Sequence, residues 1–271
     1  MEKIGCVFFH QGWTDIIVCL SLINYYSEIY DKIYILMRDG SKNLIDFYIK
    51  NFNNVFVIYF NFNIVYNPKF NIDTNFNNNY ILVDNNIIRI PENYDILFHY
   101  HFDIYRKDKY KNINKIKNIQ ISSFQEAFYK YYDIDFSTRI NKFEFTRNLE
   151  LENSVYENFI NQYSNKYILY HDDENNTRNG NFYVNTKINF DIKKSDFNYV
   201  NLNLKSNTFF DYIKVLINSA EMHLIDSVWG ALIFQLDAKY GLFGHIPIYL
   251  YPFRNHHNIF NNPKLNNWTI K

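Results

Sequence analysis

The chain has 271 residues, enough for one large α/β domain or for two lobes of roughly 120 to 150 residues each. Lys and Arg total 28, Asp and Glu also total 28, and neither sign forms a long block. This balance argues against a general nucleic-acid or anionic-membrane surface, while a small, specific anion site remains compatible with it. The abundance of Asn, Ile, Lys, Tyr and Phe indicates an AT-rich genome. The 20% of aromatic residues is therefore interpreted first as core filling.

The N-terminal apolar run, Ile4 to Phe9, is interrupted by His10 and is too short for a signal-peptide core or a membrane span. No later segment reaches about eighteen consecutive apolar residues. Cys6 and Cys19 lie in apolar surroundings and are interpreted as reduced core residues. We therefore expect a protein without a membrane span, in a bacterial or host-cell cytoplasm.

Strands and helices alternate from the start of the chain. The run Ile4 to Phe9 predicts a strand, and apolar residues at helical spacing between Ile16 and Ile23 predict a helix after a Gly-containing turn. A strand over 32–37, a helix over 44–52 and a strand over 55–59 follow. This order is typical of a parallel, doubly wound sheet. An Asn-rich irregular stretch over 61–79 precedes short strands at 81–83, 87–90 and 94–100 and a helix over 123–132.

The second half of the chain repeats the alternation after a helix predicted over 148–163. Strands are predicted over 167–170, near 200–204, and over 222–225 and 246–251, with helices over 209–219 and 228–236. We place a boundary just before the helix predicted over 148–163, which divides the chain into lobes 1–145 and 146–271. The expected fold is α/β, with two Rossmann-like lobes and a ligand cleft at the carboxyl ends of the strands.

The turn from His10 to Asp15 follows the first strand and starts a helix. It places an imidazole and a carboxylate beside free backbone N–H groups, which can bind an anion, with Gly12 allowing close approach. Asp15 has two interpretations. It compensates the helix dipole, or it is a general base that takes a proton from an attacking hydroxyl while His10 orients it or contacts substrate.

A second turn of the same kind runs from His223 to Gly230. Asp226 or Ser227 can cap the following helix, and the Ser227 hydroxyl with the next N–H groups, those of Val228 and Trp229, suits a diphosphate. An ordinary capped helix explains the same residues. His223, inside an apolar strand, fits a buried structural histidine as well as a ligand contact.

The segment from His171 to Gly180 follows another strand. Its Arg178 can bind a phosphate oxygen pair in bidentate fashion. The acidic run 172–174 is either a divalent-metal site or a solvated loop. The alternating His99, His101 and Asp103 share a strand face as metal ligands would, but no fourth ligand is visible nearby. We expect no metal and no other cofactor.

These turns resemble known motifs. His10 to Asp15 resembles the G-x-x-D opening turn of GT-B glycosyltransferases of the ADP-heptose:lipopolysaccharide heptosyltransferase type, and 222–236 resembles the V-D-T-G-x turn of that family. The chain is also similar to small glycosyltransferase-like proteins of bacterial polysaccharide clusters and large DNA viruses, which share an H-x-G-x-G-D start, an F-Y … R-x-x-x-F middle and an H-x-x-D-S-x late turn. The corresponding middle residues are Phe128, Tyr129, Arg139, Phe143 and Arg147.

The resemblance implies a metal-independent, inverting glycosyltransferase that moves a sugar from a nucleotide-sugar donor to a hydroxyl of a glycan or other acceptor. Asp15 would then be the base. Ser227, the amides after it and Arg178 would hold the donor diphosphate, a role that extends to Gly12 and Asp226. Trp13, His171 and His223 are possible substrate contacts.

Bulky residues distinguish this chain from the families that it resembles. Trp13 and Trp229 stand where those families have glycine or small residues. An alternative is therefore a non-catalytic nucleotide- or glycan-binding protein of the same fold. A nucleotide-sugar hydrolase or epimerase is a third possibility.

Overall fold

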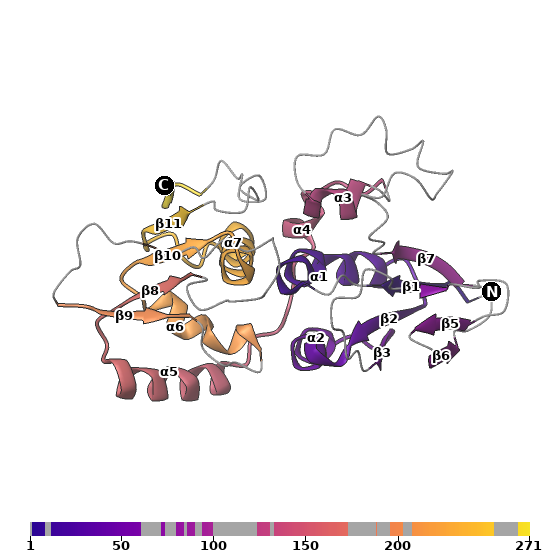
Figure 1. The fold of residues 1–271 in the computed structure, drawn as a ribbon, viewed down its shortest axis with the longest axis horizontal. Helices are drawn as coiled ribbons and strands as arrows, with labels where there is room; N and C mark the ends of the chain where they lie inside the picture. The colour runs from indigo at the N-terminus through magenta and orange to yellow at the C-terminus, as the bar shows by residue number, and fades with distance from the viewer. Residues whose placement is uncertain are drawn as a thin grey trace.

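A computed structural model of the chain describes residues 2–8, 12–60, 72–73, 80–83, 86–89, 94–99, 124–130, 133–172, 188, 196–202, 208–251 and 265–271. The described part is an α/β structure with two separate parallel sheets, which lie toward opposite ends of the longest axis in Figure 1. Helices from the two halves meet between the sheets.

The first sheet has the strand order β3-β2-β1-β7, and all of its neighbours are parallel. Its strands are β1 (Ile4–Phe8), β2 (Lys32–Arg38), β3 (Val55–Phe60) and β7 (Tyr94–His99). Helix α1 (Trp13–Ser27) connects β1 to β2, while the short 3-10 turn η1 (Asp39–Ser41) and helix α2 (Lys42–Ile49) connect β2 to β3. The predicted alternation of strands and helices is confirmed here, with β7 placed beside β1.

Helix α1 is a central element because almost every side of it is apolar. Its buried residues include Ile16, Val18, Leu20 and Ile23, which point in several directions around the helix. A helix that is hydrophobic on most sides must be covered on most sides. Accordingly, it packs against β2 within its own half, against α7 of the second half, and against α3 and α4.

A third, small sheet is antiparallel, and its strands are not part of either parallel sheet. It has the order β4-β5-β6, from strands β4 (Ile72–Asp73), β5 (Tyr80–Val83) and β6 (Asn86–Arg89). The strands predicted over 81–83 and 87–90 are β5 and β6. Most of the Asn-rich stretch over 61–79 lies outside the described residues.

The second sheet has the order β12-β11-β10-β8-β9 and is again parallel throughout. Its strands are β8 (Tyr167–His171), β9 (Asn198–Asn201), β10 (Met222–Ile225), β11 (Ile248–Tyr251) and β12 (Trp268–Ile270). The helices of this half are α5 (Leu149–Tyr163), the 3-10 turn η5 (Phe209–Tyr212), α6 (Ile213–Ile217) and α7 (Val228–Tyr240). Asn148 caps α5, because its side chain accepts a hydrogen bond of 3.1 Å from the Leu151 amide.

Three elements differ from the sequence-based expectation. The helix predicted over 209–219 is a 3-10 turn followed by the short α6. Helix α4 (Thr138–Asn141), which follows α3 (Phe124–Lys130), and the edge strand β12 were not predicted. Both unpredicted elements are very short, so periodicity over their length carries little signal.

The two halves share one apolar core, which contains residues of both sheets and of α1 and α7. Phe210 of η5 is 1% exposed and reaches into the first half, where its ring lies 5.1 Å from that of Phe47 on α2. Its ring also lies 4.4 Å from that of Phe145 in the connecting segment. Both sheets are compatible with Rossmann-like lobes. The division into domains 1–145 and 146–271 and the cleft between them stay predictions.

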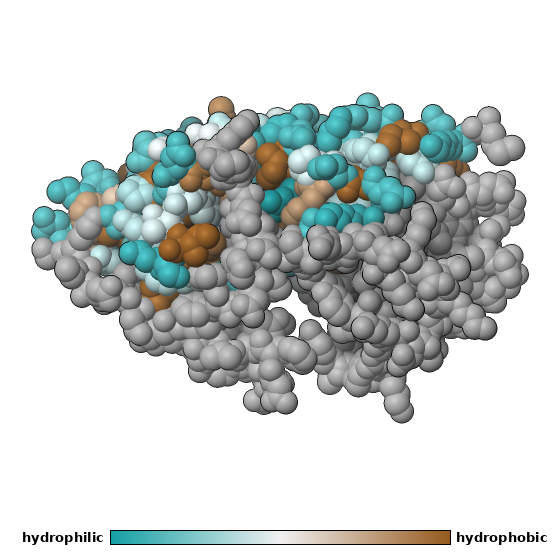
Figure 2. All heavy atoms as spheres, turned by 90° about the horizontal axis from the view of Figure 1, so that it is seen from above, coloured by the Kyte–Doolittle hydropathy of each residue, from teal (hydrophilic) through white to brown (hydrophobic). Residues whose placement is uncertain are grey.

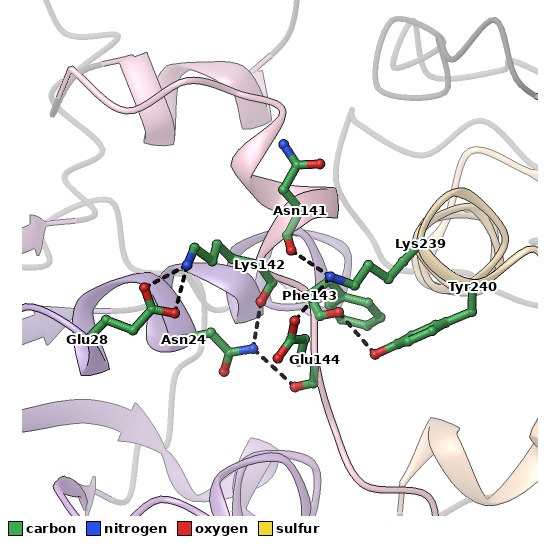
Figure 3. A network of polar contacts seen from close by, with 8 residues as sticks. All are labelled: Asn24, Glu28, Asn141, Lys142, Phe143, Glu144, Lys239 and Tyr240. Atoms are coloured by element: carbon green, nitrogen blue, oxygen red, sulfur yellow. Dashed lines mark hydrogen bonds and ion pairs between the residues drawn. The ribbon is translucent and has the colours of Figure 1, made fainter.

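The segment that connects the halves is bound to both of them (Figure 3). Four successive carbonyls accept hydrogen bonds: that of Asn141 from Lys239 Nζ (2.6 Å), that of Phe143 from the Tyr240 hydroxyl (3.1 Å), and those of Lys142 and Glu144 from Asn24 Nδ2 (2.6 and 3.1 Å). Asn24 belongs to α1, whereas Lys239 and Tyr240 belong to α7. The connecting segment thus links α1 to α7 through hydrogen bonds to its backbone carbonyls, in addition to the covalent link that it makes between the halves.

On the face drawn in Figure 2, the described residues are mainly hydrophilic, and hydrophobic residues form separate patches. Scattered patches of this kind are ordinary on protein surfaces. Among the described helices, none combines the length and the apolar character needed to cross a membrane.

Candidate functional site

The strand orders define one switch point in each sheet. In the first sheet, β1 lies between β2 and β7, so the connections from β1 and into β7 run to opposite sides. In the second sheet, the corresponding place is between β8 and β10. Ligands of open parallel sheets bind outside the carboxyl ends of the strands at such points. The turns into α1 and α7 start at the carboxyl ends of β1 and β10, that is, at these two points.

One aromatic ring connects the starts of the two helices. The ring of Phe209 in η5 lies 5.3 Å from that of Trp13, the first residue of α1, and 5.0 Å from that of Trp229, in the first turn of α7. Both contacts are edge-to-face, at 75° and 86°. The two turns that were singled out from the sequence therefore lie on either side of a single ring.

The start of α7 holds a polar pair from two strands. Ser227 precedes the helix, and its hydroxyl shares a hydrogen bond of 2.7 Å with Nδ1 of His171, the last residue of β8. Both side chains are buried, and so is Asp226, which is 1% exposed. The first intrahelical bond runs from the Ala231 amide to the Ser227 carbonyl. The amides before Ala231 therefore have no acceptor within the helix.

A second polar pair lies at the same edge of the sheet. Asp172, directly after β8, is 2% exposed and accepts a hydrogen bond of 3.0 Å from Asn201 Nδ2 at the end of β9. The carboxyl ends of β8, β9 and β10 thus carry His171, Asn201 and Ser227 side by side. Because parallel strands end at a common edge, residues that are far apart in the chain form one polar group here.

The start of α1 contains Gly12, Trp13 and Thr14, all partly exposed, and the buried Asp15. Gly12 precedes the helix with φ of −76°, a conformation open to any residue, so backbone strain does not require glycine there. Asp15 is 7% exposed and accepts a hydrogen bond of 2.9 Å from Gln125 Nε2 on α3. Burial raises the pKa of the nearby Cys19 thiol well above its usual range, and the charge of Asp15 adds to this shift.

His223 is the remaining predicted site residue that the structure describes. His223 stacks on Tyr249 of β11 at 4.7 Å between ring centroids, and its Nδ1 lies 3.1 Å from the Tyr251 hydroxyl. The same ring has Nε2 3.5 Å from the Glu221 carboxylate. These contacts fit the structural interpretation of His223. His10 and Arg178 lie outside the described residues, as do His101, Asp103 and the acidic residues after Asp172.

The side chain and the backbone of Trp229 lie in different environments. Its indole is 2% exposed and packs against Phe209 and Tyr212, so it contributes to the core. Only its amide remains a candidate contact for a ligand. Val228 is partly exposed and is the point of this helix start that a ligand can approach. Within the described ranges, no three His, Cys, Asp or Glu side chains gather as metal ligands would.

Sequence reasoning missed Gln125, Asn201 and Phe209. Gln125 and Asn201 are polar residues with no neighbouring motif, and their partners, Asp15 and Asp172, lie far away in the chain. Phe209 is one of many phenylalanines in an aromatic-rich sequence. Position in the chain provides no signal for any of the three, because their roles arise from contacts between separate elements.

The fold and the site define the class of the protein: an α/β protein with two parallel sheets, in which two strand-to-helix turns at switch points lie close together. Comparison with protein-family models, with curated proteins and with solved structures finds no match to this chain.

Proposed function

We propose that this protein is a glycosyltransferase that moves a sugar from a nucleotide-sugar donor to a hydroxyl of an acceptor. The observation that carries the proposal is the pairing of the α1 and α7 starts around Phe209. Glycosyl transfer needs a base near the acceptor hydroxyl and stabilisation of the leaving diphosphate. One turn offers a carboxylate and the other a positive helix end. Their proximity supports a joint role.

The start of α7 is the proposed donor side. Amides without intrahelical acceptors and the helix dipole favour an anion such as a diphosphate. His171 holds the Ser227 hydroxyl at this helix start through the 2.7 Å hydrogen bond at its Nδ1. We expect the diphosphate to bind the first turn near the partly exposed Val228, and charge developing on the leaving group to be stabilised by the same groups.

The start of α1 is the proposed acceptor side. Asp15 is the base, and the hydrogen bond from Gln125 orients its carboxylate. Gln125 is a positioning residue in this scheme. In a single displacement, the acceptor oxygen bonds to the anomeric carbon as the bond to the diphosphate breaks, and Asp15 takes the acceptor proton. The product then has the inverted configuration.

Nucleotide binding tests the donor side. Thermal unfolding with UDP, GDP, ADP, CMP, dTDP and their sugars should reveal one nucleotide that stabilises the protein by about 2.7 kcal/mol at a hundredfold excess over its Kd. Ser227→Ala should weaken that response. Ser219→Ala is the matched control, because Ser219 is also buried but bonds the Leu216 carbonyl in α6. A protein that responds to no nucleotide would contradict the proposal.

The role of Asp15 is tested by a variant that keeps its shape. Asp15→Asn can still accept the bond from Gln125, so we expect nucleotide affinity to persist while release of nucleoside diphosphate from donor and acceptor falls by at least about a hundredfold. Asp237→Asn is the control, since among the described residues the Asp237 carboxylate accepts from Phe243 N and Trp268 Nε1, both within its own half. Parallel loss of binding and turnover in Asp15→Asn would assign Asp15 a structural role.

A non-catalytic nucleotide- or glycan-binding protein is the second candidate. The observation that favours it is the filling of the space between the helix starts by Trp13, Phe209 and Trp229. It predicts the same thermal response to a nucleotide but no consumption of any nucleotide sugar with any acceptor. Turnover assays across donors and acceptors thus separate the two candidates.

A further inference from the structure

Arg139, in helix α4, is a buried cation whose guanidinium group lies against two aromatic rings. The residue is 6% exposed. Its Cζ lies 4.1 Å from the centroid of the Phe136 ring and 5.1 Å from that of the Phe234 ring. Across the described parts of the chain, no carboxylate, amide or carbonyl accepts a hydrogen bond from its N–H groups. Its hydrogen bonds are made by the backbone: the amide donates to the Phe136 carbonyl at 3.2 Å, and the carbonyl accepts from Gln235 Nε2 at 3.0 Å.

Within the described residues, this arrangement leaves the N–H groups of the guanidinium without a protein acceptor. A guanidinium group carries five N–H donors, and aromatic rings attract the cation without replacing strong acceptors. Burial lowers the pKa of Arg139 to about 10, while the charges of Tyr129 and Glu126 act in the opposite direction. The side chain therefore stays positive at neutral pH. Glu126 is already engaged, because its carboxylate lies 2.6 Å from Lys130 Nζ.

The surroundings hold Arg139 in place from three helices. Phe136, which lies under the guanidinium, packs edge-to-face on Tyr129 of α3 at 5.4 Å. The Tyr129 hydroxyl bonds Ser21 Oγ of α1 at 2.9 Å. Phe234 and Gln235 belong to α7. A cation fixed in this way loses little freedom when it binds a ligand, which favours affinity.

Arg147 is a second arginine of the chain, and its guanidinium group is paired with a carboxylate. Its Nε donates to Glu152 Oε1 at 2.9 Å, and its Nη2 bonds the other carboxylate oxygen. Glu152 is 2% exposed, so this pair is complete within the protein. Arg139 is more deeply buried than Arg147 but lacks such a partner among the described residues.

We propose that Arg139 binds an anionic oxygen group, a phosphate or a carboxylate, of a small ligand. Guanidinium groups bind both in bidentate geometry. Phe234 lies six residues after Val228, about 9 Å along the helix axis at 1.5 Å per residue. The Arg139 site is thus separate from the start of α7, and it does not depend on glycosyl transfer.

The test compares the wild type with Arg139→Met and with the control Arg147→Lys, which keeps a cation beside the buried Glu152. Thermal unfolding is followed in concentration series of inorganic phosphate, pyrophosphate and malonate at constant ionic strength, with NaCl as reference. We expect a saturable rise in Tm in the wild type and in Arg147→Lys, and no such rise in Arg139→Met. The arm that responds identifies phosphate or carboxylate. General salt effects appear in all three proteins alike.

Arg139→Met is expected to fold, because replacing a buried charge by an apolar side chain of similar length is often tolerated. If Arg139→Met does not fold, the variant Arg139→Lys is tested in its place. The lysine keeps the charge but loses bidentate geometry, so we expect at least a tenfold higher apparent Kd for the active anion. The proposal is overturned if no anion stabilises the wild type beyond NaCl, or if the variants at position 139 respond as the wild type does.

Discussion

At the scale of single residues, the candidate site depends on a few polar side chains that are almost completely buried. Asp15, Asp172, Asp226 and Ser227 are all less than a tenth exposed. Buried polar groups persist in proteins when they are hydrogen-bonded, and Gln125, Asn201 and His171 supply such bonds. Sites of this kind are sensitive to the loss of either partner, because the remaining group is left buried without its bond.

Asp211 provides a prediction on pH. It lies in η5 beside Phe210. Burial raises the pKa of its carboxyl, and the charge of Glu152 acts in the same direction, while hydrogen bonds from Thr208 oppose the shift. An acid whose folded-state pKa is raised binds more protons in the folded state. Its contribution to stability is therefore present at low pH and is lost as the pH rises from about 3.9 through the raised value.

Replacing Asp211 by Asn removes this charge and keeps an acceptor for Thr208. We expect Asp211→Asn to have a higher Tm than the wild type at pH 7 and an equal Tm at pH 3.5. Thermal unfolding across this pH range measures the difference. Asp237→Asn is the control, and a lower Tm of Asp211→Asn at pH 7 would show that its hydrogen bonds outweigh desolvation.

At the scale of elements, the segment 141–144 connects α1 to α7 through its carbonyls (Figure 3). Asn24 is the main contributor on the α1 side, since its amide donates to two of these carbonyls. Its side chain is 7% exposed, so water replaces it poorly. The geometry of the connection is thus coupled to a single residue of α1.

We expect Asn24→Ala to lower the free energy of unfolding by about 2–4 kcal/mol, because two backbone acceptors lose their donor. It should also increase tryptic cleavage after Lys142 and Arg147, which mass spectrometry can locate. Asn54→Ala is a matched control, since Asn54 also donates to two carbonyls, those of Ser27 and Tyr30, but within the first half. Equal cleavage of 141–148 in both variants would contradict the coupling.

Sequence patterns predicted the long elements better than the short ones. Helix α1 and strand β1 were recognised from apolar spacing, because buried elements of several turns or residues leave a periodic trace. Strand β12, with the three residues Trp268–Ile270, was missed because its existence depends on pairing with β11. The carboxyl-end positions of Ser227 and Asp15 were predicted from their turns, whereas their partners His171 and Gln125 were not assigned to them.

At the scale of the whole molecule, the shared core makes the two halves interdependent. Phe210 of the second half contacts the ring of Phe47 in the first half at 5.1 Å and that of Phe145 in the connecting segment at 4.4 Å, while Trp13 and Trp229 meet through Phe209. A core that is continuous between two sheets favours cooperative unfolding. Tryptophan fluorescence then reports on the contact region through Trp13 and Trp229 and on β12 through Trp268, and far-UV circular dichroism reports on the helices and sheets of both halves.

We expect these two signals to give one coincident transition in urea. Phe210→Ala should lower the free energy of unfolding by about 3–5 kcal/mol, the usual cost of removing a buried aromatic ring, while the transition stays single. Phe159→Ala is the comparison within the second half, where Phe159 packs on Tyr163 and Tyr167. Two separate transitions in the wild type would instead mean that the halves unfold independently.

The sequence alone determined the local alternation of strands and helices, the α/β class and the turns that start α1 and α7, because these depend on neighbouring residues and on hydrophobic periodicity. Tertiary structure alone decided the strand orders, the contact of the two turns through Phe209, the Ser227–His171 bond and the burial of the Arg139 guanidinium against aromatic rings. These features join residues that are distant in the chain. Local pattern carries no information about which distant surfaces pack together, whereas packing decides which polar groups meet and which remain without a partner.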